Sequence, residues 1–185
     1  WRKLTNNHSE SRQLSDLKAK IEETAGHFPS RRSAIMPALF LAQEQYGSIT
    51  NDAMEEVADI LGVPKVWIFE IANFYTMYNK EPVGKFHIQV CTNLSCMLRE
   101  ADGIVARLEE QIGVKTGETT ADGMFTLSAV ECLGSCGTAP MMQVNKTYYE
   151  DLTVEGIDEI LKELREKAGN GGERRRHDAN GGDRD

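Results

Sequence analysis

The sequence predicts a protein of the α/β class, with an all-α helical bundle at the N-terminal side and a small α/β domain after it. Three observations predict this organisation. Over residues 11–80 the apolar side chains recur every three or four positions, which is helical spacing. Over residues 82–166, segments with strand alternation are mixed with helical segments. Residues 167–185 have no large apolar side chain, so we expect a disordered tail there.

Four segments of the first part have helical spacing. They are residues 11–28, 30–47, 50–62 and 64–79. The third segment follows residues that can cap a helix, and a glycine comes at its end. The fourth opens with Pro64, a residue favoured at the first position of a helix. Short links between the four segments predict a small bundle.

The second part has the predicted order β-α-β-β-β-α. Residues 83–91 and 125–132 are predicted strands, 140–150 a hairpin, and 97–113 and 153–167 amphipathic helices. The hairpin is expected to turn near Asn145 and Lys146. This order predicts a small α/β sandwich.

The charge and composition exclude several classes of protein. The net charge is −8 and the isoelectric point is about 5.1, whereas a nucleic-acid-binding protein normally presents a basic face. No apolar run approaches the roughly 20 residues that span a bilayer, so we expect no direct membrane insertion. The opening residues lack the apolar stretch of a secretory signal. We therefore expect a reducing compartment, in which structural disulfides are rare.

All four cysteines occur as two close pairs, in "CTNLSC" and "ECLGSC". Cys91 is expected to end one strand and Cys96 to open the following helix. Cys132 is expected to end another strand, and Cys136 follows it in a loop punctuated by glycine. Since neighbouring strands of one sheet can end side by side, the sequence predicts that the four thiols converge.

Three chemistries are open to such a set of thiols. Structural zinc usually takes tighter C-x-x-C pairs, and thiol–disulfide enzymes use the same spacing with one activated cysteine. A [2Fe-2S] cluster needs four thiolates on two irons, which two chelating pairs supply directly. The spacing favours the cluster and leaves zinc and redox thiols open. A helix N-terminus near Cys96, together with Gly134 and Gly137, is expected to direct N–H groups toward the sulfurs.

Three stretches carry a specific resemblance: "FYTMYNKEPVGKFHIQVCTNLSCM", "GETTADGMFTL" and "ECLGSCGTAPMMQVNKTYYEDLT". They resemble the thioredoxin-like [2Fe-2S] subunit of the NADH dehydrogenase module of respiratory complex I, and the resemblance extends over roughly residues 12–165. It implies a thioredoxin-like [2Fe-2S] ferredoxin domain after the helical bundle. It also implies that Cys91, Cys96, Cys132 and Cys136 ligate one [2Fe-2S] cluster.

The resemblance further implies an electron-transfer subunit of an NADH:quinone oxidoreductase, with no catalytic residue and no complete active site of its own. Its cluster would exchange single electrons with the flavin of a partner subunit during NADH oxidation. FMN and NADH are expected on that flavin- and NADH-binding subunit, next to further iron–sulfur subunits. The expected location is cytoplasmic, peripheral to the inner membrane, or on the matrix side of the mitochondrion in a eukaryote.

Two alternatives to this function stay open. The same kind of subunit serves NAD-linked hydrogenases and formate dehydrogenases, whose distinguishing active sites lie on other chains. More distantly, residues 51–74 imitate a helix-turn-helix, which suggests a zinc-binding regulator of DNA. Acidic residues outnumber basic ones between residues 50 and 80, so this segment would repel phosphate.

Several residues near the cysteines have a structural and a functional interpretation. His87 shares a strand face with Cys91 and could ligate or tune a metal, but a structural histidine is favoured. The Ala139–Pro140 peptide bond is expected to be cis, as it often is at this place in thioredoxin-like folds. Met141 and the methionine after it are expected either to shield the metal from water or to fill the core.

Overall fold

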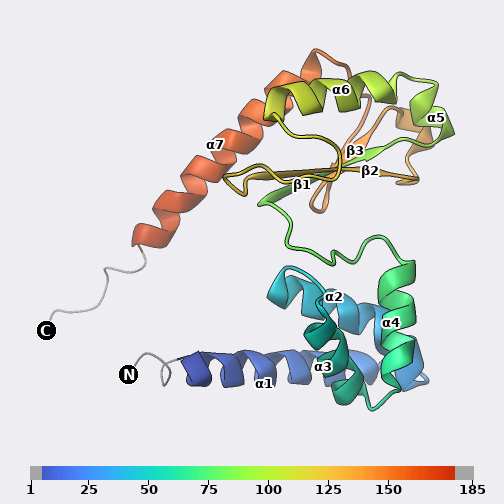
Figure 1. The fold of residues 1–185 in the computed structure, drawn as a ribbon, viewed down its shortest axis with the longest axis vertical. Coiled ribbons are helices and arrows are strands. Elements are labelled where there is room, and N and C mark those ends of the chain that lie inside the picture. Colours follow the sequence, from blue (N-terminus) through green and yellow to red (C-terminus); the bar gives the residue numbers. More distant parts are fainter. Residues whose placement is uncertain (1–5, 178–185) are drawn as a thin grey trace, which may run out of the picture. The chain divides into compact units, whose positions relative to one another are not determined.

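The computed structural model describes residues 6–177 and divides the chain into two compact units between Val83 and Gly84. This division lies close to the change of period at Pro82. Figure 1 shows a purely helical first unit and a second unit of helices and strands. The structure therefore confirms the predicted α/β class with a helical N-terminal region.

The first unit is built from four α-helices and a short 3-10 helix. They are α1 (Asn6–Ala25), η1 (Arg31–Ala34), α2 (Ile35–Tyr46), α3 (Asn51–Leu61) and α4 (Lys65–Phe74). Their buried faces form one core, which includes Leu17, Leu39 and Ile68. The predicted helical stripes are therefore the faces that the unit buries.

Local interactions explain where two of these helices begin and end. The Thr50 side chain accepts a hydrogen bond from the Ala53 N–H at 3.3 Å and caps the start of α3. Gly62 ends α3 with a left-handed φ of 62°. The last helix, α4, ends at Phe74, before the predicted end at residue 79, because the backbone at Tyr75 is extended. The Lys80 ammonium donates to the carbonyl of Ala72 and so satisfies one of the groups freed there.

Tyr78 is a buried polar side chain of the helical unit. Its hydroxyl donates to the Met36 carbonyl oxygen at 3.0 Å, and its ring packs against Phe40 with centroids 5.1 Å apart. Burial, with a smaller contribution from Tyr75, raises the pKa of Tyr78 to about 12. The neutral phenol is therefore the form that the fold stabilises.

Replacing Tyr78 by phenylalanine is expected to lower the free energy of unfolding by about 1 kcal/mol near neutral pH, since the Met36 carbonyl loses its donor. The pKa rises on folding from 10.0 to about 12, so the contribution of the hydroxyl is complete below pH 10 and is lost as the pH approaches 12. Chemical unfolding of both proteins across this range measures the difference. A gap that stays constant from pH 8 to pH 12 would contradict the assignment.

The second unit contains a four-stranded sheet. Its elements are β1 (Phe86–Cys91), α5 (Leu94–Met97), α6 (Ala101–Ile112), β2 (Phe125–Val130), η2 (Cys136–Thr138), β3 (Met142–Val144), β4 (Thr147–Tyr149) and α7 (Gly156–His177). The strand order is β2-β1-β3-β4. The pair β1–β2 is parallel, and the pairs β1–β3 and β3–β4 are antiparallel. The predicted order of strands and helices and the hairpin turn after Val144 are confirmed.

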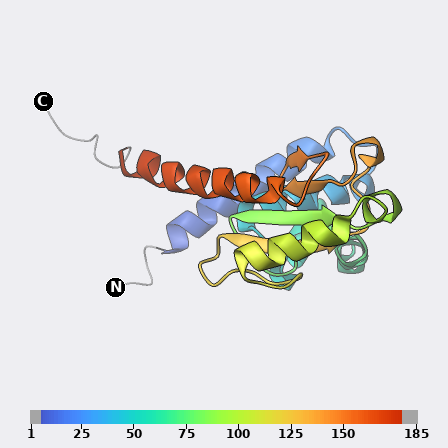
Figure 2. The same cartoon turned by 90° about the horizontal axis from the view of Figure 1, so that it is seen from above.

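The helices α6 and α7 lie over the same face of the sheet (Figures 1 and 2). Alternate residues of β1, including Ile88 and Val90, pack on this face with Leu127 of β2. Leu108 of α6 and Leu161 of α7 complete the same buried cluster. The period-two pattern of the strands and the period-3.6 pattern of the helices therefore meet in one core.

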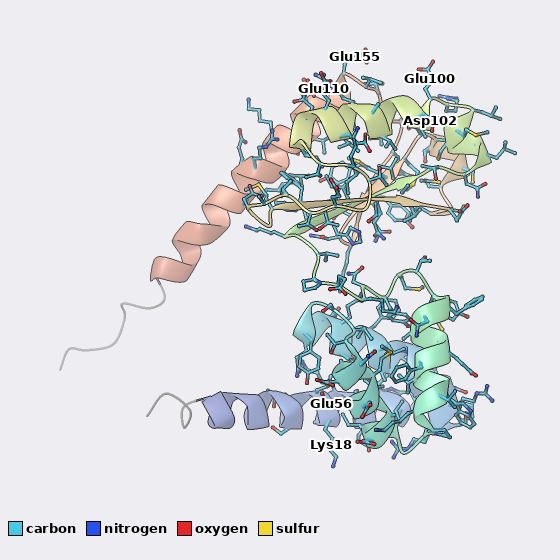
Figure 3. All side chains as sticks on the ribbon, in the orientation of Figure 1. Lys18, Glu56, Glu100, Asp102, Glu110 and Glu155 are labelled. Carbon is cyan, nitrogen blue, oxygen red and sulfur yellow. The ribbon has the colours of Figure 1, made fainter. Side chains whose placement is uncertain are left out.

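The predicted single helix over residues 97–113 is wrong. The chain forms two helices, α5 and α6, which are separated by residues 98–100. Glu100 adopts a left-handed φ of 67°, and its carbonyl oxygen accepts from the Gly103 and Ile104 N–H groups at the start of α6. Figure 3 labels Glu100 and Asp102 at this junction. The break leaves Cys96 in a helix of four residues.

The prediction of disorder from Lys167 onward is wrong for residues 167–177, because α7 continues to His177. The packed first half of α7 supplies the nucleus, and each further residue then adds a hydrogen bond at little cost. The Lys85 ammonium also donates to the Ala168 carbonyl oxygen at 3.1 Å. Residues 178–185, the rest of the predicted tail, lie outside the described residues. Within residues 6–177, no helix combines the length and the apolar content that crossing a membrane requires.

Candidate metal centre

The parallel pairing of β1 and β2 brings the two cysteine segments together. In this register Cys91 is opposite Val130, the last residue of β2. Cys132 follows two residues later, in a loop rather than at the strand end that the sequence predicts. Cys96 lies in α5, and Cys136 begins η2. The carboxyl ends of two neighbouring strands therefore position both pairs at one edge of the sheet.

The thiols interact across the two pairs. The Cys91 thiol hydrogen-bonds with the thiols of Cys96 and Cys132, and Cys96 interacts electrostatically with Cys91 and Cys136. All four cysteines are free thiols. The structure therefore assembles the predicted set of four sulfurs without forming a disulfide.

The centre has a buried side and an exposed side. Cys91 and Cys96 are 3% and 2% exposed, and they pack with Ala101, Ala139 and Met141 in a small apolar cluster. Cys132 and Cys136, in contrast, are exposed. One pair is thus shielded from water, while the other faces the surface of the second unit.

Backbone N–H groups surround the sulfurs. Burial raises the pKa of the Cys91 thiol, but the N–H groups of Asn93 and Leu133 and the neighbouring thiols lower it more, so the net pKa lies below its ordinary value. The Gly134 N–H donates to the Cys132 sulfur at 3.4 Å. Gly134 has a φ of 83°, which a residue with a Cβ rarely adopts. The predicted role of this glycine is confirmed, and these donors favour thiolates.

The helix-dipole part of the prediction is wrong. Cys96 is the third residue of the four-residue helix α5, which is too short to build a significant dipole at its N-terminus. Burial raises the pKa of the Cys96 thiol, and the neighbouring Cys91 raises it further. The stabilisation of sulfur charge therefore comes from individual N–H groups rather than from a long helix.

The other residues singled out from the sequence have defined places. The Ala139–Pro140 bond is cis, as predicted. Met141 packs against Cys91 and Cys96, whereas the following Met142 belongs to the core under the helices. His87 Nε2 and Ser128 Oγ share a hydrogen bond of 2.8 Å, and burial lowers the pKa of this histidine. These contacts favour the structural interpretation of the histidine.

Two further residues at the centre were not predicted from the sequence. Glu150 and Tyr148 hydrogen-bond to the loop that contains Cys132 and Cys136. Both belong to a segment that follows the loop by more than ten residues, and no local pattern links the two. The predicted hairpin turn at Asn145 is the signal that could have brought them into consideration, since it returns the chain toward the loop.

The available donors fit a [2Fe-2S] cluster. Two pairs of thiols can hold two irons, and N–H groups near sulfur stabilise the anionic cluster. Among residues 6–177, no three Cys, His, Asp or Glu side chains are grouped as a site for a single metal ion. The chain therefore offers two pairs of sulfur ligands at one sheet edge.

Comparisons with known proteins agree with this fit. The family described as "Thioredoxin-like [2Fe-2S] ferredoxin" matches residues 21–165. A subunit of the NADH-quinone oxidoreductase of Rhizobium meliloti (strain 1021) is 48% identical over 149 residues, which cover 80% of this chain and 89% of that protein. A subunit of the same name from Rickettsia conorii (strain ATCC VR-613 / Malish 7) is 45% identical over 163 residues, covering 88% and 96%.

A solved structure shows the same fold at low identity. The NAD+-reducing [NiFe]-hydrogenase in the air-oxidized state matches with a TM-score of 0.62 and 19% identity. The match covers 72% of this chain and only 23% of that chain, so it supports the fold alone. From the family match and the two bacterial relatives together, the chain belongs to the thioredoxin-like [2Fe-2S] ferredoxin family, among those members that are subunits of NADH-quinone oxidoreductase.

Proposed function

We propose that this chain is an electron-transfer subunit of an NADH:quinone oxidoreductase and that Cys91, Cys96, Cys132 and Cys136 ligate one [2Fe-2S] cluster. The observation that carries the proposal is the assembly of four free thiols from two parallel strand ends. When bound, such a cluster accepts and donates one electron at a time. The relatives from Rhizobium and Rickettsia supply the parent complex.

Each part of the site has a separate task in this proposal. The buried sulfurs of Cys91 and Cys96 hold one side of the metal centre among apolar residues, which exclude water. The N–H groups of Leu133 and Gly134 stabilise thiolate charge from the loop side. The exposed pair, Cys132 and Cys136, leaves one side of the centre accessible. A redox group of a partner subunit can approach from that side.

NADH oxidation itself is assigned to a partner subunit. The sequence contains neither a G-x-G-x-x-G fingerprint nor a P-loop, and we place FMN and NADH on the neighbouring subunit. Exchange of single electrons with that flavin, further iron–sulfur subunits and a peripheral position at the cytoplasmic or matrix side of the inner membrane belong to the same proposal. The relatives' membership of an oxidoreductase complex supports it.

The equivalent subunit of an NAD-linked hydrogenase is the second candidate, and the solved hydrogenase chain of the same fold supports it. The identity of 44–48% to several subunits of NADH-quinone oxidoreductases favours the latter complex. Mass spectrometry of the subunits that purify with this chain distinguishes these complexes, and also a formate dehydrogenase.

The cluster is tested on the protein purified without oxygen. Visible absorption, iron and sulfide analysis, and electron paramagnetic resonance after reduction are expected to report one [2Fe-2S] cluster. A colourless protein that contains zinc, or no metal, would overturn the proposal. Zinc would return attention to the helix-turn-helix alternative, for which salt-dependent binding to duplex DNA is the next measurement.

A further inference from the structure

The loop between Cys132 and Cys136 has little apolar anchoring. Both cysteines are exposed, and Leu133 is only partly buried against the small apolar cluster. A ligand loop must nevertheless hold its sulfurs in place, because a metal centre tolerates only small changes in ligand position. The loop therefore depends on polar contacts from another part of the chain.

Those contacts come from residues 148–152, which follow the β3–β4 hairpin. The Tyr148 hydroxyl donates to the Leu133 carbonyl oxygen at 2.9 Å. The Asp151 N–H donates to the Thr138 carbonyl oxygen at 2.8 Å, and the Leu152 N–H donates to that of Pro140 at 2.9 Å. The segment is thus joined to the chain on both sides of Cys136.

Glu150 makes the charged contact within this segment. Its Oε1 atom accepts hydrogen bonds from the hydroxyls of Ser135 and Thr138, the latter at 2.6 Å. The two hydroxyls also lie 2.9 Å from each other. Hydrogen bonds to an ionised acceptor are about twice as strong as neutral ones. One carboxylate oxygen therefore holds the residues on either side of the Cys136–Gly137 pair.

We propose that Glu150 is a positioning residue of the metal centre, which fixes the loop of residues 132–138 so that Cys132 and Cys136 present their sulfurs for ligation. The inference rests on the proposed cluster site and adds a residue that contacts no ligand atom itself. The carboxylate also adds a negative charge beside the ligand loop. Negative charge disfavours the addition of an electron, so it lowers the reduction potential of the centre.

The proposal is tested on the full chain carrying its cluster, with the rate of iron release to a ferrous chelator as the first readout. Glu150→Ala is expected to release iron about tenfold faster, because loss of an outer hydrogen-bond partner typically weakens metal binding 10- to 100-fold. Glu150→Gln keeps an oxygen acceptor for both hydroxyls and should recover most of the retention. Glu155→Ala removes an exposed glutamate from the turn before α7 and should release iron at the wild-type rate.

Spectroscopy separates positioning from general stability. The electron paramagnetic resonance spectrum of reduced Glu150→Ala is expected to differ from the wild type, while that of Glu155→Ala is expected to match it. The reduction potential should rise in Glu150→Gln, which removes the charge and keeps the acceptor. A potential and a spectrum that stay at the wild-type values in both Glu150 variants would overturn the proposal.

A paired change on the loop side keeps the test decisive if Glu150→Ala does not fold. The Ser135→Ala, Thr138→Val variant removes both donors and should also release iron faster; combined with Glu150→Ala, it should add little, because the three groups form one network. Iron release at the wild-type rate in this variant would overturn the inference alone. A wild-type protein without a [2Fe-2S] cluster would instead overturn the proposed function.

Discussion

Replacing Cys96 by alanine is expected to abolish the visible absorption of the purified protein and the electron paramagnetic resonance signal of its reduced form. Loss of an outer hydrogen-bond partner typically costs 10- to 100-fold in metal affinity, and loss of a direct ligand should cost at least about 100-fold. Iron analysis of the protein purified without oxygen measures the effect. Ser95→Ala, at the neighbouring residue of α5, is the matched control and should retain the cluster.

The two sides of the centre should differ in what the same change does to the protein without metal. Cys96 is 2% exposed within the small apolar cluster, so Cys96→Ala should lower the free energy of unfolding by about 1 kcal/mol through lost packing. Cys132 is exposed, so Cys132→Ala should change it by less than about 0.5 kcal/mol. Both variants should lose the cluster. Retention of iron and an unchanged spectrum in either would contradict its assignment as a ligand.

Periodicity could predict the elements of the fold because each buries one face. Leu17 and Ile21 mark the buried side of α1, and Ile88 and Val90 mark that of β1. The break between α5 and α6 could not be predicted in this way. The apolar residues on either side of it continue a helical period, whereas the break depends on the left-handed conformation of Glu100, a conformation rare for a residue with a side chain.

The site shows the same limit at longer range. The cysteines could be identified because their types and spacing are local features, and parallel pairing of β1 with β2 supplies the rest. Glu150 could not, because its role depends on the register of the β3–β4 hairpin, in which Met142 is opposite Tyr149. That pairing returns the chain to the ligand loop. Tertiary contacts of this kind are not encoded in any short sequence window.

Leu127→Ala is expected to have the largest effect on the stability of the second unit. Leu127 is fully buried and lies opposite Ile88 in the parallel β1–β2 pair, under the helices of this unit. Truncation of a buried leucine leaves a cavity and typically costs 2–5 kcal/mol, and we expect about 3–4 kcal/mol here. Because β2 leads directly to Cys132, the variant should also release iron faster than the wild type.

Hydrogen exchange measured by mass spectrometry on the full chain tests where the stability is lost. Leu127→Ala should reduce the protection of β1 and β2, because their amides depend on the core that the leucine fills. Leu39→Ala is the matched control: Leu39 is equally buried but belongs to the core of the helical unit. It should reduce the protection of α1 and α2 and leave the rate of iron release unchanged. Full protection of β1 and β2 in Leu127→Ala would show that this side chain does not support the strand ends on which the thiols depend.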